Sequence, residues 1–394
     1  VTGVQTCALP ISAGRNQPAQ QQAQQQQQSP QGITTIARQA IILDFASGRV
    51  LYEKNADERM PPSSMSKMMT GYLVYKAIRE GKLKLDDTLP VSQRAWKMGG
   101  SKMFVALNSR VKVEDLIRGM VIQSGNDACI VLAEGLAGSE GSFVDWMNEE
   151  AQKMGMTGSH YANSTGWPDP EHYATARDLA ILATRLIKEF PKEYKYYGEL
   201  SFTYGTDEKG KPITQGNRNP LLYRNVGADG VKTGHTEDAG YGLTASAVRE
   251  GRRVLMVLNG LPSIKARTEE SERLIDWAFR EYGNYNLFKA GQPVEQADVW
   301  LGDKPSVALV SNTDIVASLP RRLRPQMKVS VVYDAPIPAP IARGATLGKV
   351  VVSAAGMDPL EYPLVANDNV ERLGLGGRMA ASVGYLLFGS GNKK

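Results

Sequence analysis

The spacing of the apolar residues in this chain changes from a strand-like to a helical period and back, and this order restricts its possible folds. Residues 39–54, QAIILDFASGRVLYEK, read as two strands joined at Ser47-Gly48. Helical spacing follows, and strand-like runs return in residues 229–260, where Glu250-Gly251 marks a hairpin. Because helices lie between the early and the late strands, we expect a mixed sheet built from both ends of one domain.

Several segments have the spacing of buried or amphipathic helices. Pro61-Pro62-Ser63 is a helix-start signal before residues 64–82, whose apolar side chains recur at helical spacing. Two strongly apolar helices are predicted at 111–123 and 128–138, with the polar turn 124–127 between them. Residues 142–155 read as an amphipathic helix and 266–283 as a long one; the former carries Phe143, Trp146 and Met147.

After about Leu287 the pattern is that of a second, all-β domain. Short alternating runs such as VWLGDKPSVALVSN and LGKVVVSAAG are interrupted by Pro and Gly. We predict a small β-sandwich at 291–366, followed by a separate tail, 367–394. A chain of 394 residues is long enough for two such cores.

The N-terminal segment has a different character. Residues 1–12, VTGVQTCALPIS, resemble the translation of a sequencing-adapter oligonucleotide, so we expect them not to belong to the natural protein. The alternative is the end of a truncated signal peptide, since Ala8–Ile11 is mildly apolar. The Gln-rich residues 13–32 offer little to bury and are predicted to be a disordered tether.

Composition argues against several kinds of function. The net charge is only +5, and no dense Lys/Arg stripe with interleaved aromatics occurs, so we do not expect nucleic-acid binding. Two cysteines, Cys7 and Cys129, and three histidines do not group at metal-ligand spacing, so we expect neither a metal nor a cofactor. No G-x-S-x-G sequence supports a Ser-His-Asp triad.

A Ser-x-x-Lys sequence, Ser64-Met65-Ser66-Lys67, begins the predicted helix 64–82. Residues three apart share a helix face, so the hydroxyl and the amine can meet. A serine hydroxyl needs a base to become a nucleophile, and lysine is that base only if its pKa falls from about 10.4 towards 7. Burial and a second cation would both lower that pKa. The alternative is that Ser64 only caps the helix.

Ser124-Gly125-Asn126 forms a second candidate motif, between the two apolar helices. Because those helices would hold the turn firmly, its hydroxyl could relay a proton and its amide could grip a substrate amide. The alternative is ordinary turn chemistry.

Lys232-Thr233-Gly234, after the turn at Asp229-Gly230, is the third candidate motif. Lys and Thr would supply a cation and a hydroxyl for a terminal carboxylate, and Gly would let a bound peptide approach the backbone closely. The alternative is a surface strand with an exposed lysine.

Together, Ser-x-x-Lys, Ser-x-Asn and Lys-Thr-Gly occur in the order found in penicillin-interacting serine enzymes. Residues 34–285 resemble the low-molecular-mass penicillin-binding proteins, the serine-type D-alanyl-D-alanine carboxypeptidases, most clearly in LIRGMVIQSGNDACIVLAEGLAG and DGVKTGHTEDAGY. The resemblance implies an α/β (α+β) fold of the serine β-lactamase/DD-peptidase type, with an antiparallel sheet flanked by helices, for residues 33–290. The small β domain and a C-terminal amphipathic helix match the layout of that family.

The resemblance also implies a role for each motif residue. Ser64 would attack the penultimate D-alanine carbonyl and become the acyl-ester, Lys67 would accept its proton, and Ser124 would pass a proton to the leaving amine. The backbone N–H groups of Ser64 and His235 would form the oxyanion hole. Lys232 would also lower the pKa of Lys67. The resemblance implies that the substrate is also bound by Asn126, Lys232, Thr233, Gly234, Arg218 and Arg267. The alternative for the two arginines is that they form ordinary surface salt bridges.

Other functions compete with this prediction. A serine β-lactamase shares nucleophile and fold, but needs a deacylating Glu; the segment 159–178 contains Glu171 without the E-x-x-L-N arrangement. An endopeptidase or transpeptidase would share the acyl-enzyme and differ in the acceptor. A non-catalytic wall-binding protein would be expected to lack Ser64 or Lys67, and both are present.

Partners and location follow from the same resemblance. We expect peptidoglycan stem peptides as substrates, β-lactam antibiotics as covalent inhibitors, and a place on the periplasmic face of the bacterial cytoplasmic membrane. The apolar run RMAASVGYLLF, residues 378–388, is too short to span a bilayer but could lie on its surface. The alternative is a helix packed on the β domain.

Overall fold

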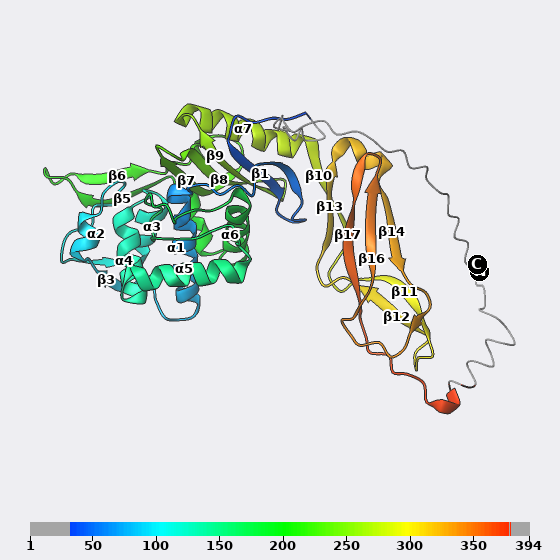
Figure 1. Ribbon diagram of the computed structural model, residues 1–394. Coiled ribbons are helices and arrows are strands. Elements are labelled where there is room, and N and C mark those ends of the chain that lie inside the picture. The colour runs from blue at the N-terminus through cyan, green and yellow to red at the C-terminus, as the bar shows by residue number, and fades with distance from the viewer. Residues whose placement is uncertain (1–31, 378, 380–394) are drawn as a thin grey trace, which may run out of the picture. The chain divides into compact units, whose positions relative to one another are not determined.

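The computed structural model describes residues 32–377 and residue 379 of the chain (Figure 1). The adapter-like segment 1–12, all of the Gln-rich tract except Gly32, and most of the predicted membrane anchor lie outside the described residues. At the C-terminus, the residues outside the described part are 378 and 380–394. Within the part described, none of the helices combines the length and apolar character needed to cross a membrane.

A five-stranded sheet, in the order β2-β1-β9-β8-β7, joins the two ends of the first domain. As predicted, it takes strands from before and after the helices. All four pairings are antiparallel, which confirms the antiparallel sheet that the resemblance implied; the mixed sheet expected from the element order was wrong. Tight turns join β1 to β2, β7 to β8 and β8 to β9. Because a tight turn reverses the direction of the chain, strands joined in this way pair antiparallel. The strands are β1 (Gln39–Asp44), β2 (Val50–Lys54), β7 (Ala228–Thr236), β8 (Gly240–Arg249) and β9 (Arg252–Leu261).

Helices cover both faces of this sheet (Figure 1). α7 (Ile264–Glu281) lies on one face and contacts β8 and β9. The others gather on the opposite face around α1 (Lys67–Arg79), which follows the short η1 (Ser63–Ser66) and is buried on nearly all sides. Around α1 stand α3 (Val113–Val121), α4 (Asn126–Ala137), α5 (Glu140–Met154) and α6 (Ala176–Glu189).

The helix predictions are confirmed in type and differ in detail. In α5, Phe143 and Met147 are fully buried, whereas Trp146 is 43% exposed and is not part of the core stripe. Asn126 and Asp127, predicted as turn residues, form the first turn of α4. The smaller elements are α2 (Gln93–Lys97), β3 (Thr88–Pro90), β4 (Arg110–Lys112), η2 (Glu193–Gly198), β5 (Ser201–Thr206), β6 (Pro212–Gly216) and η3 (Pro220–Tyr223).

The C-terminal part is built from strands around its own apolar core, as the Pro- and Gly-interrupted pattern predicts. Six strands pair in the order β14-β16-β17-β12-β11-β15, and β10 (Tyr282–Phe288) pairs separately with β13 (Ile315–Pro320). Leu309, Leu319 and Val350 meet in the shared core. The other elements are β11 (Pro293–Trp300), β12 (Ser306–Val310), η4 (Arg321–Gln326), β14 (Lys328–Tyr333), β15 (Ile337–Pro338), β16 (Thr346–Ala354) and β17 (Met357–Ala366).

Strand β10 begins before the predicted domain boundary at residue 290. Because α7 runs directly into it, β10 continues the first domain in sequence while pairing with a strand of the second. The division into 33–290 and 291–366 therefore stays a prediction.

Candidate active site

The nucleophile motif lies at the turn between η1 and α1. Ser63 has φ +50°, a left-handed conformation that costs a non-glycine residue on the order of 1–3 kcal/mol and persists only where the surrounding structure holds it. The Lys67 Nζ lies 2.8 Å from the Ser64 Oγ. The three-residue spacing thus brings hydroxyl and amine together, as predicted.

Lys67 is held by acceptors from three parts of the chain. Besides Ser64, its Nζ donates to Asn126 Oδ1 at 2.8 Å and to the carbonyl oxygen of Thr165 at 2.7 Å. The side chain is 1% exposed. Burial lowers the pKa of Lys67 to about 8, with Arg218 acting in the same direction. A lysine with this pKa can accept a proton near neutral pH.

A second lysine–serine pair lies beside the first. Ser124, with φ +58°, is 2% exposed and accepts a hydrogen bond of 3.0 Å from Lys232 Nζ. Burial lowers the pKa of Lys232 well below its usual value, and the neighbouring charge of Lys67 lowers it further. We expected Lys232 to lower the pKa of Lys67. The repulsion between them is evident at Lys232, whereas the lowering at Lys67 comes first from burial and, among cations, from Arg218.

Asn126 makes different contacts from those foreseen. Its Oδ1 accepts from Lys67, and its Nδ2 donates to the carbonyl oxygen of Gly99 at 2.9 Å. Its backbone N–H donates to Ser101 O at 2.7 Å. Asn126 therefore positions Lys67 and the segment 99–101; its predicted role of holding the substrate remains a prediction.

Gly234 is needed for packing inside the protein. A Cβ at this position would lie 2.8 Å from the carbonyl oxygen of Pro62 and 3.2 Å from the Ser63 Cβ. Strand β7, the edge strand of the sheet, therefore passes directly against the nucleophile turn. Sequence reasoning expected the glycine to admit a substrate; the close approach seen is to the turn itself.

The predicted residues line or adjoin one cavity of about 340 Å³. Its wall includes both motif serines, the strand β7 and two arginines. Lys67 and Lys232, which are not among the lining residues, donate hydrogen bonds to Ser64 and Ser124, and Asn126 accepts one from Lys67. The lining residues are Ser64, Ser101, Ser124, Arg218, Thr233, Gly234, His235, Tyr241, Ile264 and Arg267.

The arginines give this cavity an unsatisfied positive charge. Arg267 is 6% exposed, its Nη1 and Nη2 reach carbonyl oxygens only at 3.5 and 3.4 Å, and its buried Nε has no partner among the described residues. Burial lowers the pKa of Arg267 to about 10. Arg218 donates to Ser101 Oγ at 2.6 Å. A buried guanidinium without an anionic partner is suited to a carboxylate ligand.

Sequence reasoning missed several groups of the site. The exposed ring of His235 stacks on Tyr241 with centroids 3.9 Å apart, and the Arg267 guanidinium lies 5.6 Å from the same ring. Tyr241, Ser101 and the Thr165 carbonyl carried no signal of their own, because each is brought to the site by tertiary folding. Only Tyr241 lies near a motif in the sequence, at the end of DGVKTGHTEDAGY.

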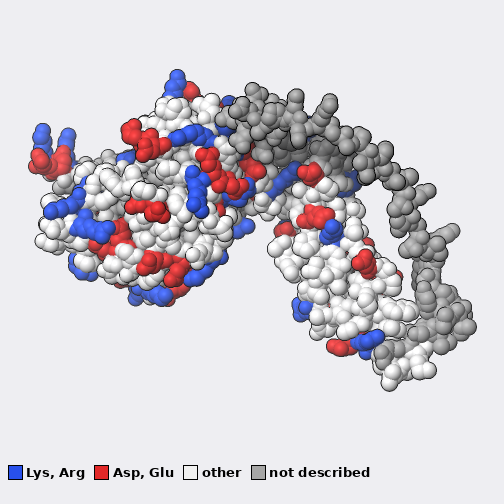
Figure 2. Space-filling model, in the orientation of Figure 1, with Lys and Arg blue, Asp and Glu red and all other residues white. Residues whose placement is uncertain are grey.

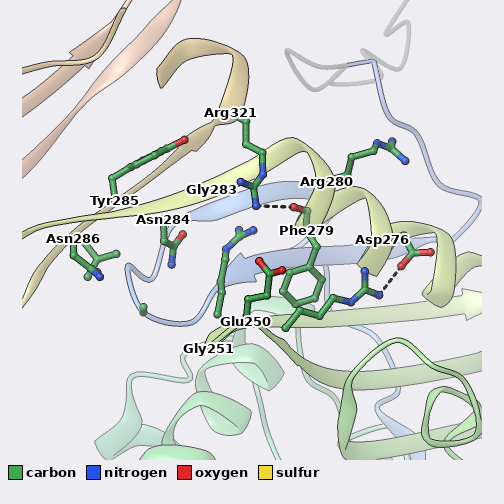
Figure 3. Close-up of a pocket in the computed structure, with 14 residues that line it drawn as sticks. Glu250, Gly251, Asp276, Phe279, Arg280, Gly283, Asn284, Tyr285, Asn286 and Arg321 are labelled. Atoms are coloured by element: carbon green, nitrogen blue, oxygen red, sulfur yellow. Dashed lines mark hydrogen bonds and ion pairs between the residues drawn. The ribbon is translucent and has the colours of Figure 1, made fainter. Parts of the chain in front are cut away.

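A larger cavity, about 770 Å³, lies elsewhere and contains none of the predicted residues (Figure 3). Two of its arginines are already engaged: Arg249 pairs with Asp276 at 2.5 Å, and Arg321 approaches the carbonyl oxygen of Phe279 at 3.4 Å. It offers no nucleophile–base pair comparable to Ser64 and Lys67, so size does not identify the reactive site.

Glu171, the carboxylate that the β-lactamase alternative requires, is not in the nucleophile cavity. It lines a different cavity, of about 670 Å³, with Asp169 and His172. This placement disfavours a deacylating role for Glu171. On the face drawn in Figure 2, acidic and basic side chains are interspersed, as expected for a chain with a small net charge.

Comparisons with known proteins identify the family. The peptidase S11 family, described as D-alanyl-D-alanine carboxypeptidase, matches residues 22–262, and the penicillin-binding protein 5 C-terminal domain matches 282–372. The chain is 36% identical to D-alanyl-D-alanine carboxypeptidase DacA of Haemophilus influenzae, over 89% of each chain. It is 37% identical to DacC of Escherichia coli, over 90% of this chain and 89% of that one.

Solved structures give the same result. Penicillin-binding protein 5 from Haemophilus influenzae has a TM-score of 0.82 at 36% identity, covering 86% of this chain and 99% of that one. Penicillin-binding protein D2 from Listeria monocytogenes, solved in an ampicillin-bound form, has a TM-score of 0.56 at 29% identity, covering 63% of this chain and 98% of that one. The matches of sequence and fold show that this chain belongs to the D-alanyl-D-alanine carboxypeptidase family of penicillin-binding proteins.

Proposed function

We propose that this chain is a serine D-alanyl-D-alanine carboxypeptidase that removes the terminal D-alanine of peptidoglycan stem peptides through an acyl-enzyme on Ser64. The observation that supports it most strongly is the 2.8 Å contact between Ser64 Oγ and the buried Lys67 Nζ. This pair borders a cavity that also holds the arginine cations a C-terminal carboxylate requires.

In acylation, neutral Lys67 takes the Ser64 proton as Oγ bonds to the carbonyl carbon of the penultimate D-alanine. The N–H groups of Ser64 and His235 stabilise the resulting oxyanion. Ser124, held by Lys232, gives its hydroxyl proton to the leaving nitrogen and recovers a proton from Lys67, so Lys67 is neutral again when the C–N bond has broken and D-alanine departs. The carboxylate of that D-alanine is bound by Thr233 with Arg218 and Arg267.

In deacylation, Lys67 again serves as the base. It takes a proton from a water molecule whose oxygen attacks the ester carbon, and the Ser64 oxygen leaves and recovers a proton. A β-lactam follows the acylation path with its ring amide as the bond that breaks. Because its leaving nitrogen stays attached to the acyl group, penicillin labels Ser64 covalently.

Carboxylate recognition predicts a preference that can be measured. The wild-type enzyme should release D-alanine from a peptide ending in D-Ala-D-Ala much faster than it cleaves the matching C-terminal amide, which lacks the charge. In Arg267→Gln that preference should fall roughly tenfold to hundredfold, because a charge-assisted hydrogen bond contributes about 1.5–3 kcal/mol. The ratio of kcat/KM for the two peptides is the measurement.

The exposed Arg224, outside the cavity, supplies the matched control, since Arg224→Gln should leave the ratio unchanged. An unaltered ratio in folded Arg267→Gln would remove the assigned carboxylate role. Absence of D-alanine release by the wild type, with release of a β-lactam hydrolysis product instead, would favour the β-lactamase alternative. Transfer of the acyl group to an added amine at the expense of hydrolysis would favour a transpeptidase.

Because its proposed substrate is peptidoglycan, the enzyme would act outside the cytoplasm. We further propose that its C-terminal tail attaches to the membrane surface. The support is sequence-based: the apolar run 378–388 is flanked by Arg372, Lys393 and Lys394, which suit anionic headgroups. The periplasmic face of the cytoplasmic membrane would then be its location.

Flotation with anionic liposomes tests the tail. The full chain should float with the vesicles, whereas a chain that ends at residue 366 should stay in the lower fraction, because it lacks both the apolar run and its cations. A neutral-lipid vesicle serves as the charge control. If the two chains behave alike, the anchor proposal fails, and the carboxypeptidase proposal is unaffected.

A further inference from the structure

A buried histidine that the reaction scheme does not use contacts the nucleophile turn. His172 is 4% exposed, and its Nε2 lies 2.8 Å from the Oγ of Ser66, the residue that directly precedes Lys67. The backbone N–H of Ala162 donates to the other ring nitrogen, Nδ1, at 3.1 Å. A nitrogen that accepts from an N–H carries no proton, so in the neutral ring the proton is on Nε2, which donates to Ser66.

The Ser66 hydroxyl continues this chain of hydrogen bonds. It accepts from His172 and donates to the carbonyl oxygen of Ser63 at 2.8 Å. That carbonyl also packs closely on Gly166, because a Cβ added to Gly166 would lie only 1.8 Å from the Ser63 oxygen. The Ser63 carbonyl is therefore held in one direction by a hydrogen bond and by close packing.

The direction of this carbonyl determines the direction of a catalytic group. Peptide units are planar, and in a trans peptide the N–H points opposite to the preceding C=O. Fixing the carbonyl of Ser63 therefore fixes the N–H of Ser64, the donor assigned to the oxyanion hole. Ser63 has φ +50°, a conformation that persists only where its surroundings hold it.

We propose that His172 is a positioning residue of this enzyme, which acts through Ser66 to orient the Ser63–Ser64 peptide and thereby the oxyanion-hole N–H. The inference rests on the proposed role of Ser64. His172 touches neither substrate nor nucleophile, and it works by holding a weak donor in the one orientation that meets the developing negative charge.

The surroundings of His172 keep the ring in the required neutral form. Burial lowers the pKa of His172 to about 4; the charges of His160 and Lys67 act in the same direction and that of Asp169 against it. At neutral pH the ring thus accepts from Ala162 and donates to Ser66. A charged imidazole would have a proton on both nitrogens and would oppose the Ala162 N–H.

Two substitutions of His172 separate positioning from packing. In His172→Gln the amide nitrogen lies near the former Nε2 and can still donate to Ser66. In His172→Asn the side chain is too short for that contact but can still accept from Ala162. We expect His172→Asn and Ser66→Ala to lower kcat, and the rate of acylation by penicillin, roughly tenfold to hundredfold, with KM within about twofold. His172→Gln should recover most of that loss.

Controls and a double variant complete the test. His160→Gln, in the same segment, should match wild type. The double variant His172→Asn/Ser66→Ala should be no slower than the slower single variant, because both remove the same chain of hydrogen bonds. Three results would overturn the proposal. They are an unchanged kcat in folded His172→Asn or Ser66→Ala, an effect on KM alone, and equal losses of kcat in His172→Asn and His172→Gln. Labelling of Ser64→Ala would instead overturn the proposed function.

Discussion

Ser64→Ala should abolish covalent labelling by a fluorescent penicillin and lower kcat for D-alanine release by at least about 10⁴-fold. The reason is that, in the described part of the chain, Ser64 is the one hydroxyl at the cavity wall that is hydrogen-bonded to Lys67. Ser124, the other motif hydroxyl, contacts Lys232 instead. Gel fluorescence of the labelled protein and a D-alanine release assay measure the two effects.

The variant should remain folded, since it removes one hydroxyl from a partly exposed position. We expect its thermal midpoint to stay within about 2–4 °C of wild type. Ser142→Ala, at an exposed position of α5, is the matched control and should label normally. Retention of the label by folded Ser64→Ala would mean that the acyl-enzyme forms elsewhere and would refute the nucleophile assignment.

Lys67→Arg should lower the acylation rate by about 10²–10⁴-fold, the usual contribution of a general base. The substitution keeps the positive charge but introduces a guanidinium that stays protonated throughout the accessible pH range. Lys76→Arg, on the same helix and paired with Glu150, controls for the exchange itself. Stopped-flow acylation by penicillin, on protein checked for folding by its thermal midpoint, gives the rates.

The wild-type pH profile carries a matching prediction. A base acts in its deprotonated form, so acylation should rise about tenfold per pH unit below pH 8 and level off above it, because the pKa of Lys67 is about 8. At pH 7 about one molecule in ten would carry neutral Lys67, against about three in ten thousand for an ordinary lysine. A flat profile between pH 6 and 9, or acylation by folded Lys67→Arg at close to the wild-type rate, would show that another group is the base.

The sequence was sufficient for features set by short spacings. The meeting of Ser64 with Lys67 follows from the three-residue offset at a helix start, and the Glu250-Gly251 hairpin from its local turn residues. After residue 290, the alternation of apolar and polar residues and the interruptions by Pro and Gly predicted strands, because both signals depend on neighbouring residues. Motif order, with the resemblance it carries, extended these local features to the family and its fold.

Sequence reasoning was less successful where a side chain's partner lies far along the chain. Nothing in the sequence indicated that the Asn126 amide contacts Lys67, 59 residues away, and Gly99; its expected substrate contact stays a prediction. Trp146 was expected on the apolar face of α5, but its side chain is largely exposed. Hydrophobic spacing cannot distinguish the edge of an apolar stripe from its centre, because that depends on which neighbour packs there.

The sequence by itself determined the segments, the order of the motifs and the pairing of Ser64 with Lys67. The tertiary structure decided how reactive that pair is. Lys67 has a lowered pKa because folding buries it and brings Arg218 close to it. The Thr165 carbonyl that holds its amine comes from 98 residues away, and Ser124 meets Lys232 across 108 residues. Burial and electrostatic environment depend on groups that are close in space, whereas periodicity reports only on groups that are close in sequence.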